Sequence, residues 1–326
     1  MGVQFRLIDG AGFAAEASAL LSAAWPEPAL RYAPEYLAWQ LSFPAPFNVP
    51  AVAAFCDSRP VGFAAMTTRR VRYRALSIDA ALVSFVAVDP DYRNQGLAAG
   101  LYRTLLSEIG KLDAPVLTFA QPGTGGLRAI ERAYPEAGFA LEPLGSYPVY
   151  GCLARPATSV ERWRPIDQTE HGPWLRRALT ACGTENGIIW SDPSDQQLEH
   201  YRRDPRRRML LVSQEEDGGI AGAAWIVEVE YVTRAGLDRV STIDCVWLPR
   251  DRPELLPSLA AAAARAWPQT DPSRPPVVHA PSLFGFDAQA LRKYGFRQVA
   301  AHFQCYAGNI AGSPFAGAAG VNIEVV

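Results

Sequence analysis

The sequence predicts an α/β protein made of two similar domains, each a mixed β-sheet flanked by helices. Three observations lead to this prediction. The chain has 326 residues, and a typical domain has ~100–200. Apolar runs of strand length alternate with amphipathic segments of helix length. Short internal repeats recur at a nearly constant spacing of 157 to 160 residues, as expected when one fold is used twice.

The first elements along the chain are a strand at 3–9 and helices at 14–25 and 34–42. Apolar residues recur at helical spacing in both helical segments, and Pro26 ends the first of them. A hairpin follows, with strands at 51–56 and 61–67.

A strongly apolar strand at 80–88 comes next, and Asp89-Pro90 ends it. The remaining elements of the first half are a long helix at 96–112, a strand at 115–120, a helix at 128–136 and strands from 139 onward. The glycine-rich segment 123–128 is interpreted as a turn.

Four pairs of segments carry the internal repeat. They are Phe5–Asp9 with Trp163–Asp167, Arg59–Ala65 with Gly219–Trp225, Phe85–Val88 with Cys245–Leu248, and Gly138–Phe139 with Gly295–Phe296. Pro156, Thr158 and Ser159 indicate a linker between the copies. We therefore expect one domain at residues 1–155 and a second at 156–326. The Gly- and Ala-rich tail at 310–320 is expected to be loosely ordered.

Composition narrows the function classes. The net charge is -2, which argues against a general nucleic-acid partner. No segment approaches the ~20 apolar residues of a membrane span, so no membrane partner is expected. Five widely spaced cysteines without a CxxC pair suggest a reducing, cytoplasmic location. The four histidines show no metal-ligand spacing, so no metal is expected.

The segment from Val86 to Gly100 is the one that points to chemistry. A buried strand ends at Pro90, and after a short loop a helix begins at a glycine, Gly96. The first N–H groups of such a helix have no intrahelical partner and lie at the positive end of the helix dipole. Small residues at Gly96 and Ala98 would let a pyrophosphate approach the backbone, and Arg93 would add positive charge.

The residues Arg93-Asn94-Gln95-Gly96-Leu97-Ala98, after the strand Val86–Pro90, closely resemble motif A of the GNAT acetyltransferase superfamily. Ala129–Phe139 resembles a later motif of the same family, with Tyr134 at its tyrosine position. The family often has an asparagine seven positions before this tyrosine, where this chain has Leu127. The resemblance covers most of residues 1–155.

The resemblance implies acetyl-CoA as co-substrate. Its pyrophosphate would bind the N–H groups of Gln95 to Ala99, and its pantetheine arm would bind backbone groups of Val86 and Val88. Tyr134 would protonate the departing thiolate as general acid. An amine, from a small molecule or a peptide, would attack the thioester directly.

The general base is left open by the sequence. An alkyl ammonium has a pKa of ~10.4, so it must lose a proton before it attacks. Ser84, which alternates with Val86 along the strand, Asp79 and Glu136 are all candidates through water.

The second half is similar to a degenerate copy of the same domain. Its counterpart of motif A, Val246–Leu255, has no glycine, and it contains Pro253 and Glu254. Leu291 stands where the first half has Tyr134. We expect this half to stabilise the first half or to shape the acceptor site. The basic run Arg202–Arg208 is interpreted as a solvated surface.

The interpretation that best fits these residues is a tandem GNAT-fold protein whose first half is an N-acetyltransferase. Three alternatives remain: transfer of a different acyl group, a non-catalytic acyl-CoA sensor, and an aminoacyl-tRNA-dependent transferase. The complete phosphate loop at Arg93–Ala98 and the balanced charge argue against the last. The sequence does not identify the acceptor amine. It is compatible with an oligomer but does not define the oligomeric state.

Overall fold

The computed structural model describes residues 2–45, 51–112, 114–154, 162–183, 187–267, 277–281, 286–309 and 312–324. The expected linker, with Pro156, Thr158 and Ser159, lies outside these residues, as does the proposed boundary at 155. The chain forms two compact units. Unit 1 contains Met1–Arg70, Asp79–Gly145 and Phe303–Gly317, and unit 2 contains Val71–Ile78, Ser146–His302 and Ala318–Val326.

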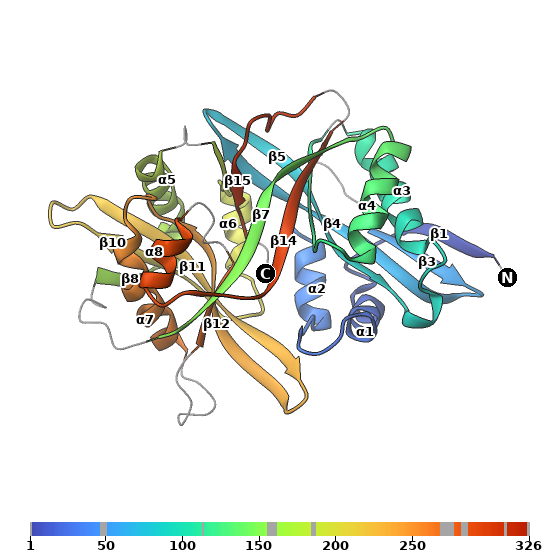
Figure 1. Ribbon diagram of the computed structural model, residues 1–326, viewed down its shortest axis with the longest axis horizontal. Coiled ribbons are helices and arrows are strands. Elements are labelled where there is room, and N and C mark those ends of the chain that lie inside the picture. Colours follow the sequence, from blue (N-terminus) through green and yellow to red (C-terminus); the bar gives the residue numbers. More distant parts are fainter. Residues whose placement is uncertain are drawn as a thin grey trace. The chain divides into compact units, whose positions relative to one another are not determined.

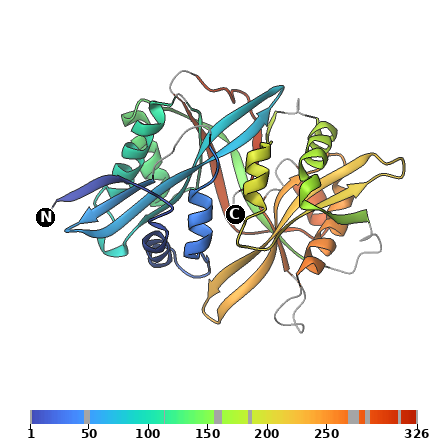
Figure 2. The ribbon, with the colours of Figure 1, turned by 180° about the vertical axis from the view of Figure 1, so that it is seen from behind.

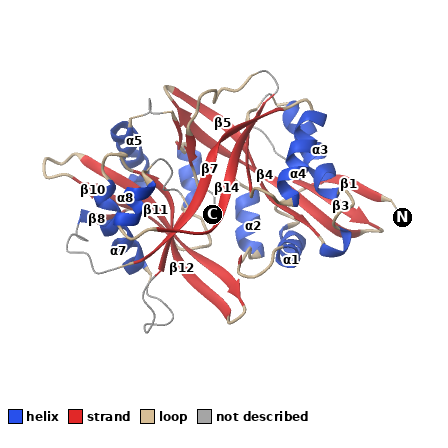
Figure 3. Cartoon of the chain, viewed as in Figure 1, coloured by secondary structure: helices blue, strands red, loops and turns tan. Residues whose placement is uncertain are grey.

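The α/β fold class predicted from the sequence is confirmed (Figure 3). The elements up to residue 153 are β1 (Val3–Ile8), α1 (Ala14–Ala24), β2 (Ala29–Leu30), α2 (Pro34–Leu41), β3 (Ala51–Cys56), β4 (Arg59–Tyr73), β5 (Leu76–Val88), η1 (Pro90–Tyr92), α3 (Leu97–Gly110), β6 (Val116–Ala120), α4 (Gly125–Glu136) and β7 (Ala140–Leu153). Every helix and strand expected in the first half is present.

The later elements repeat this pattern. They are β8 (Trp163–Ile166), η3 (Gln168–Glu170), α5 (His171–Cys182), β9 (Ile188–Ser191), α6 (Asp195–Tyr201), β10 (Arg208–Gln214), β11 (Ile220–Thr233), β12 (Gly236–Trp247), η4 (Pro253–Leu255), α7 (Leu256–Ala266), β13 (Val277–Ala280), α8 (Ala288–Lys293), β14 (Arg297–Asn309) and β15 (Gly320–Asn322).

Unit 1 has three layers. Its strands follow the order β1-β3-β4-β5-β6-β14. One face packs against α3 and α4 through a core that includes Leu101, Leu105 and Ile130. The other face packs against α1 and α2 through Leu21, Leu37 and other residues. Figures 1 and 2 show these helices from opposite sides.

Unit 2 has the same layered plan. Its strands follow the order β7-β13-β12-β11-β10-β8. Helices α7 and α8 cover one face, where Leu256, Leu259 and Leu291 join the core. On β11, Trp225 contacts the His171 ring of α5 and the Tyr201 ring of α6. Helices α5 and α6 therefore contribute to a second packed region of this unit.

The two halves of the chain exchange strands. In unit 1, β14, from the second half of the chain, pairs with β6 from Gln304↔Ala120 to Gly308↔Val116. In unit 2, β7, which begins in the first half, pairs with β13 from Val277↔Leu153 to Ala280↔Tyr150. Unit 1 therefore receives the last long strand of the second half, β14, beside β6. Unit 2 receives the last strand of the first half, β7, beside β13.

Two sequence-based expectations are wrong. The segment 123–128 is not only a turn, because α4 begins at Gly125 and the Thr124 hydroxyl accepts the Leu127 N–H at 3.3 Å as an N-cap. The described part of the tail is packed: Phe315 is fully buried and Gly320 is the first residue of β15, which pairs with β9. Composition missed this because small residues also suit close packing.

None of the described helices combines the length and hydropathy needed to cross a bilayer. All five cysteines are buried thiols without a disulfide.

Candidate functional site

Strand β5 leaves β6 partway along its length. The parallel pairing runs from Ala81↔Val116 to Val83↔Thr118, and within the described residues it goes no further. Phe85 has a φ of 57°, in the left-handed region that a bulky side chain rarely adopts. The backbone edge of β5 beyond Val83 therefore offers N–H and C=O groups that β6 does not use.

The irregularity at Phe85 sets which side chains share a face. Val83 and Val86 both pack against the core under α3 and α4, whereas Phe85 packs on the α1 and α2 side. A residue spacing of three on one face means that regular alternation breaks between Val83 and Val86. Simple alternation therefore no longer places Ser84 on the face of Val86, and the position of the Ser84 side chain stays a prediction.

The loop after β5 turns sharply into α3. Asp89 Oδ1 accepts the Asp91 N–H at 3.0 Å, and its other oxygen pairs with Arg59 at 2.7 Å. Asn94 and Gly96 then take positive φ values of 63° and 79°. Left-handed geometry at two nearby positions turns the chain so that α3 starts directly at Leu97.

The N-terminus of α3 is open. Gly96 makes no side-chain cap, and a Cβ placed on it would meet no atom within 4 Å. The N–H groups of Leu97, Ala98 and Ala99 precede the first residue that can bond within the helix, and Gly100 is the first that does so, to the Gly96 carbonyl. The side chains of Asn94 and Gln95 are exposed beside it. This geometry suits an anionic group.

Arg93 has a contact that the sequence did not suggest. Its Nη2 donates a hydrogen bond to the Ala24 carbonyl at the end of α1. The guanidinium therefore ties the loop to α1.

Tyr134 lies on α4, completely buried, and its hydroxyl has no hydrogen-bond partner among the described residues. Burial raises its pKa well above the ordinary value, and the neighbouring Tyr102 adds to this effect. Thr118, the last residue of β6 that pairs with β5, also has a buried hydroxyl, which lies close enough to Tyr134 to lower the pKa of that phenol. The Tyr134 and Thr118 hydroxyls thus lie near each other where β5 and β6 separate, as expected where a polar substrate group binds.

The three candidate bases differ in their surroundings. Glu136 is bound by Arg132 at 3.0 Å and by Arg103 at 2.9 Å. The hydrogen bond from Arg132 lowers its pKa, and Arg103 acts in the same direction. A carboxylate with a lowered pKa is a weaker base, which disfavours Glu136. Asp79 and Ser84 are half-buried on β5.

The corresponding region of unit 2 has no open glycine turn. Before α7, Arg252 is bound to Glu254 at 2.6 Å and to Glu215 at 2.7 Å. Leu255 and Leu256 are buried at the helix start. Leu291 is buried in the apolar core at the position of Tyr134. This region therefore has neither a glycine turn that could bind a phosphate nor a tyrosine hydroxyl that could donate a proton.

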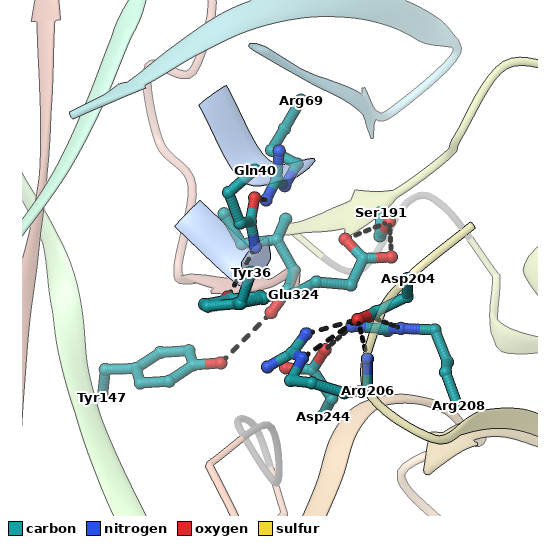
Figure 4. A network of polar contacts seen from close by, with 11 residues as sticks. Tyr36, Gln40, Arg69, Tyr147, Ser191, Asp204, Arg206, Arg208, Asp244 and Glu324 are labelled. Carbon is teal, nitrogen blue, oxygen red and sulfur yellow. Dashed lines mark hydrogen bonds and ion pairs between the residues drawn. The ribbon is translucent and has the colours of Figure 1, made fainter. Parts of the chain in front are cut away.

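Two arginines of the basic run Arg202–Arg208 form ion pairs inside unit 2, as Figure 4 shows for Arg206 and Arg208. Arg208 is bound to Asp204 at 2.9 Å and to Asp244 at 3.0 Å, and Arg206 is bound to Asp204 at 3.0 Å. Burial opposes the charge on Arg208, yet Asp244 and Asp204 raise its pKa above the ordinary value. The interpretation of the whole run as a solvated surface is wrong for these two arginines.

The described part of the chain has no group of three or more His, Cys, Asp or Glu side chains able to hold a metal ion.

Sequence reasoning missed two parts of this site. The sequence around Phe85 does not indicate its left-handed backbone conformation, because that conformation depends on how β5 separates from its neighbouring strands. Gly308 of β14 lies against the Tyr134 ring. The weak repeat that joins Gly138–Phe139 to Gly295–Phe296 could have suggested that equivalent strands follow, but not that they are exchanged.

Comparison with known families agrees with this geometry. Residues 14–139 match the acetyltransferase (GNAT) family model. A comparison with curated protein sequences found no significant match.

Solved structures of similar fold cover nearly the whole chain. One is the N-myristoyltransferase of Saccharomyces cerevisiae with bound myristoyl-CoA, with 13% identity, a TM-score of 0.68, and coverage of 96% of this chain and 84% of that chain. Another is a GCN5-related N-acetyltransferase from Anabaena variabilis, with 14% identity, a TM-score of 0.54, and coverage of 93% and 72%.

The family match and the site together support an acyltransferase. Residues 14–139 thus match the GNAT acetyltransferase family, and the fold of the whole chain is similar to that of the N-myristoyltransferase and of the GCN5-related N-acetyltransferase.

Proposed function

We propose that the protein transfers an acetyl group from acetyl-CoA to an amine, with the donor bound in unit 1. The observation that carries this proposal is the open N-terminus of α3 directly after β5. From Ser84 to Val88, the backbone edge of β5 is not paired with β6. The N–H groups of Gln95 to Ala99 would bind the pyrophosphate. The backbone of Val86 and Val88 would bind the pantetheine arm.

The reaction is a direct acyl transfer. A bond forms between the amine nitrogen and the acyl carbon as the carbon–sulfur bond breaks, and the electron pair of that bond leaves on sulfur. Tyr134 supplies a proton to the departing thiolate, and the amine proton leaves through water. A raised pKa keeps the Tyr134 phenol protonated at neutral pH, which suits a proton donor and not a base.

Calorimetric titration of acetyl-CoA into the wild type and Gly96→Glu tests the donor site. The substitution places a carboxylate where the pyrophosphate is expected, so binding should be lost. Gly218→Glu is the matched control, because Gly218 also has a positive φ and open space around a Cβ but lies in a turn of unit 2. Both variants carry similar backbone strain.

The proposal is supported if only Gly96→Glu loses binding while both variants remain folded. It fails if the wild type binds no acyl-CoA, or if Gly96→Glu binds as well as the control. Acetyl-, hexanoyl- and myristoyl-CoA titrated in parallel determine the acyl group. Tighter binding of a long chain would reject acetyl as the preferred donor.

A further inference from the structure

Arg69 is a buried cation on β4 that pairs with no carboxylate in the described chain. The residue is 4% exposed. Its Nη1 donates to the Thr68 carbonyl at 3.1 Å and its Nη2 donates to Gln40 Oε1 at 3.0 Å. Both acceptors are neutral, so the positive charge stays uncompensated. A buried ion in this state is costly unless an anion joins it.

The Nε side of the Arg69 guanidinium is buried without a hydrogen bond to a described residue. The Thr67 hydroxyl is also buried without a described partner. Residues two apart on a strand point to the same face. Phe63 and Ala65 of the same strand belong to the core under α1 and α2. Two unused donors are thus expected on this face.

The arginine is held in a defined orientation. Gln40 on α2 is 3% exposed, and its Nε2 donates to Tyr36 Oη at 2.7 Å. This bond leaves Gln40 Oε1 as the acceptor for Arg69, as Figure 4 shows. The guanidinium also lies 4.3 Å from the centre of the Phe43 ring. Because Gln40 and Phe43 hold the guanidinium in one orientation, a ligand that binds it loses little further side-chain entropy.

A row of aromatic contacts connects this arginine to the expected acyl site. Phe85, directly before Val86, lies 5.5 Å from the Tyr32 ring. Tyr32 lies 6.1 Å from Tyr36, which binds Gln40. All of these residues belong to unit 1. Arg69 and β5, the strand proposed to bind the pantetheine arm, therefore belong to one continuous packed region.

We propose that Arg69, together with the Thr67 hydroxyl, binds a carboxylate of the acceptor, so that the acceptor is an amine that also carries a carboxylate. The free N–H side of a guanidinium matches the geometry of a carboxylate. This inference rests on the proposed transfer to an amine and specifies its substrate class.

The test compares acceptors that differ only in this charge. The twenty common L-amino acids and their amides are offered with acetyl-CoA to wild type, Arg69→Met and Arg70→Met. Methionine keeps much of the length of arginine without its charge. Arg70 is the matched control, as the next residue on β4 and partly exposed. Binding of the twenty N-acetyl amino acids and their amides is measured by calorimetry, independently of turnover.

Wild type and Arg70→Met should prefer at least one free acid to its amide by about 10- to 100-fold, as expected for hydrogen bonds to a charged group. Arg69→Met should lose this preference while its affinity for acetyl-CoA and its urea unfolding midpoint do not fall. A lowered midpoint with an unchanged preference would show a purely structural arginine and overturn the proposal.

The carboxylate site and the acetyltransferase function can be rejected separately. Acylation of amides as fast as acids by wild type, or binding of N-acetyl acids no tighter than their amides, would overturn the carboxylate site and leave the transferase standing. Absence of acetyl-CoA binding would reject the proposed function. Tight, Arg69-dependent binding of an N-acetyl acid in that case would still support the carboxylate site.

Discussion

The Tyr134 ring lies directly against the backbone of Gly308, although the two residues are far apart in the sequence. A Cβ placed on Gly308 would come within 2.4 Å of Tyr134 Cε1. Gly308 pairs with Val116 at the start of β6, so its backbone cannot easily withdraw. The strand that unit 1 receives from the end of the chain thus determines where the proposed acid sits.

This contact predicts the effect of Gly308→Ala. The added methyl group must displace the Tyr134 ring or the strand, which we expect to lower the free energy of unfolding by about 1–3 kcal/mol. The turnover number should fall more than the affinity for acetyl-CoA, because the added methyl group meets Tyr134 and Phe139 and not the N-terminus of α3. Urea unfolding and steady-state kinetics measure the two effects. Gly125→Ala on α4 is the control, since a Cβ placed there would meet no atom closer than 3.9 Å. Equal kinetics for both variants would contradict the prediction.

Tyr134→Phe separates catalysis from packing. The lost hydroxyl is buried beside the Thr118 hydroxyl and makes no well-formed hydrogen bond with a described residue, so the free energy of unfolding should change by no more than about 1 kcal/mol. The turnover number should fall by roughly 10²- to 10⁴-fold if the hydroxyl is the general acid. Thermal or urea unfolding, together with release of free thiol from acetyl-CoA, provides both readings. A destabilised variant with full turnover would assign Tyr134 to the core alone.

His171 makes unit 2 sensitive to acid. Burial lowers its pKa from 6.5 to about 4, and the hydrogen bond to the Ile166 carbonyl only partly opposes this. The folded state therefore binds fewer protons than the unfolded state between these values. The contribution is complete above pH 6.5 and is lost as the pH falls towards 4, with a total of up to about 3 kcal/mol.

The variant His171→Gln should remove this pH dependence. Unfolding free energies of wild type and variant, measured at pH 7 and pH 5, should differ more at the higher pH. A constant difference between the two proteins would show that His171 does not titrate in this range.

Local sequence signals predicted the first half well because its elements are defined by local chemistry. Pro26 and Asp89-Pro90 end α1 and β5 near the expected residues. The open glycine turn at Gly96 follows from residues next to one another in the chain. The motif residues could therefore be identified from sequence, and their ligand contacts stay a prediction.

Long-range relationships could not be predicted in the same way. The bulge at Phe85, the contact of Gly308 with Tyr134 and the uncompensated charge of Arg69 all depend on which segments meet in three dimensions. Arg69 follows a run of apolar and small residues on β4, where a sequence pattern cannot reveal whether a charge finds a partner. The exchange of strands also leaves no local signal, because β7 and β14 each look like an ordinary final strand.

The late arrival of Phe303–Gly317 has a consequence for synthesis of the protein on the ribosome. Unit 1 has most of its residues once Gly145 has emerged, yet it lacks the strand that covers β6 until the last part of the chain is made. At ~5–20 residues per second, the roughly 160 intervening residues take about 8–30 s to translate. During this time the nascent domain exposes a sheet edge that can pair with other chains. Folding of the proposed donor site is therefore coupled to synthesis of Phe303–Gly317.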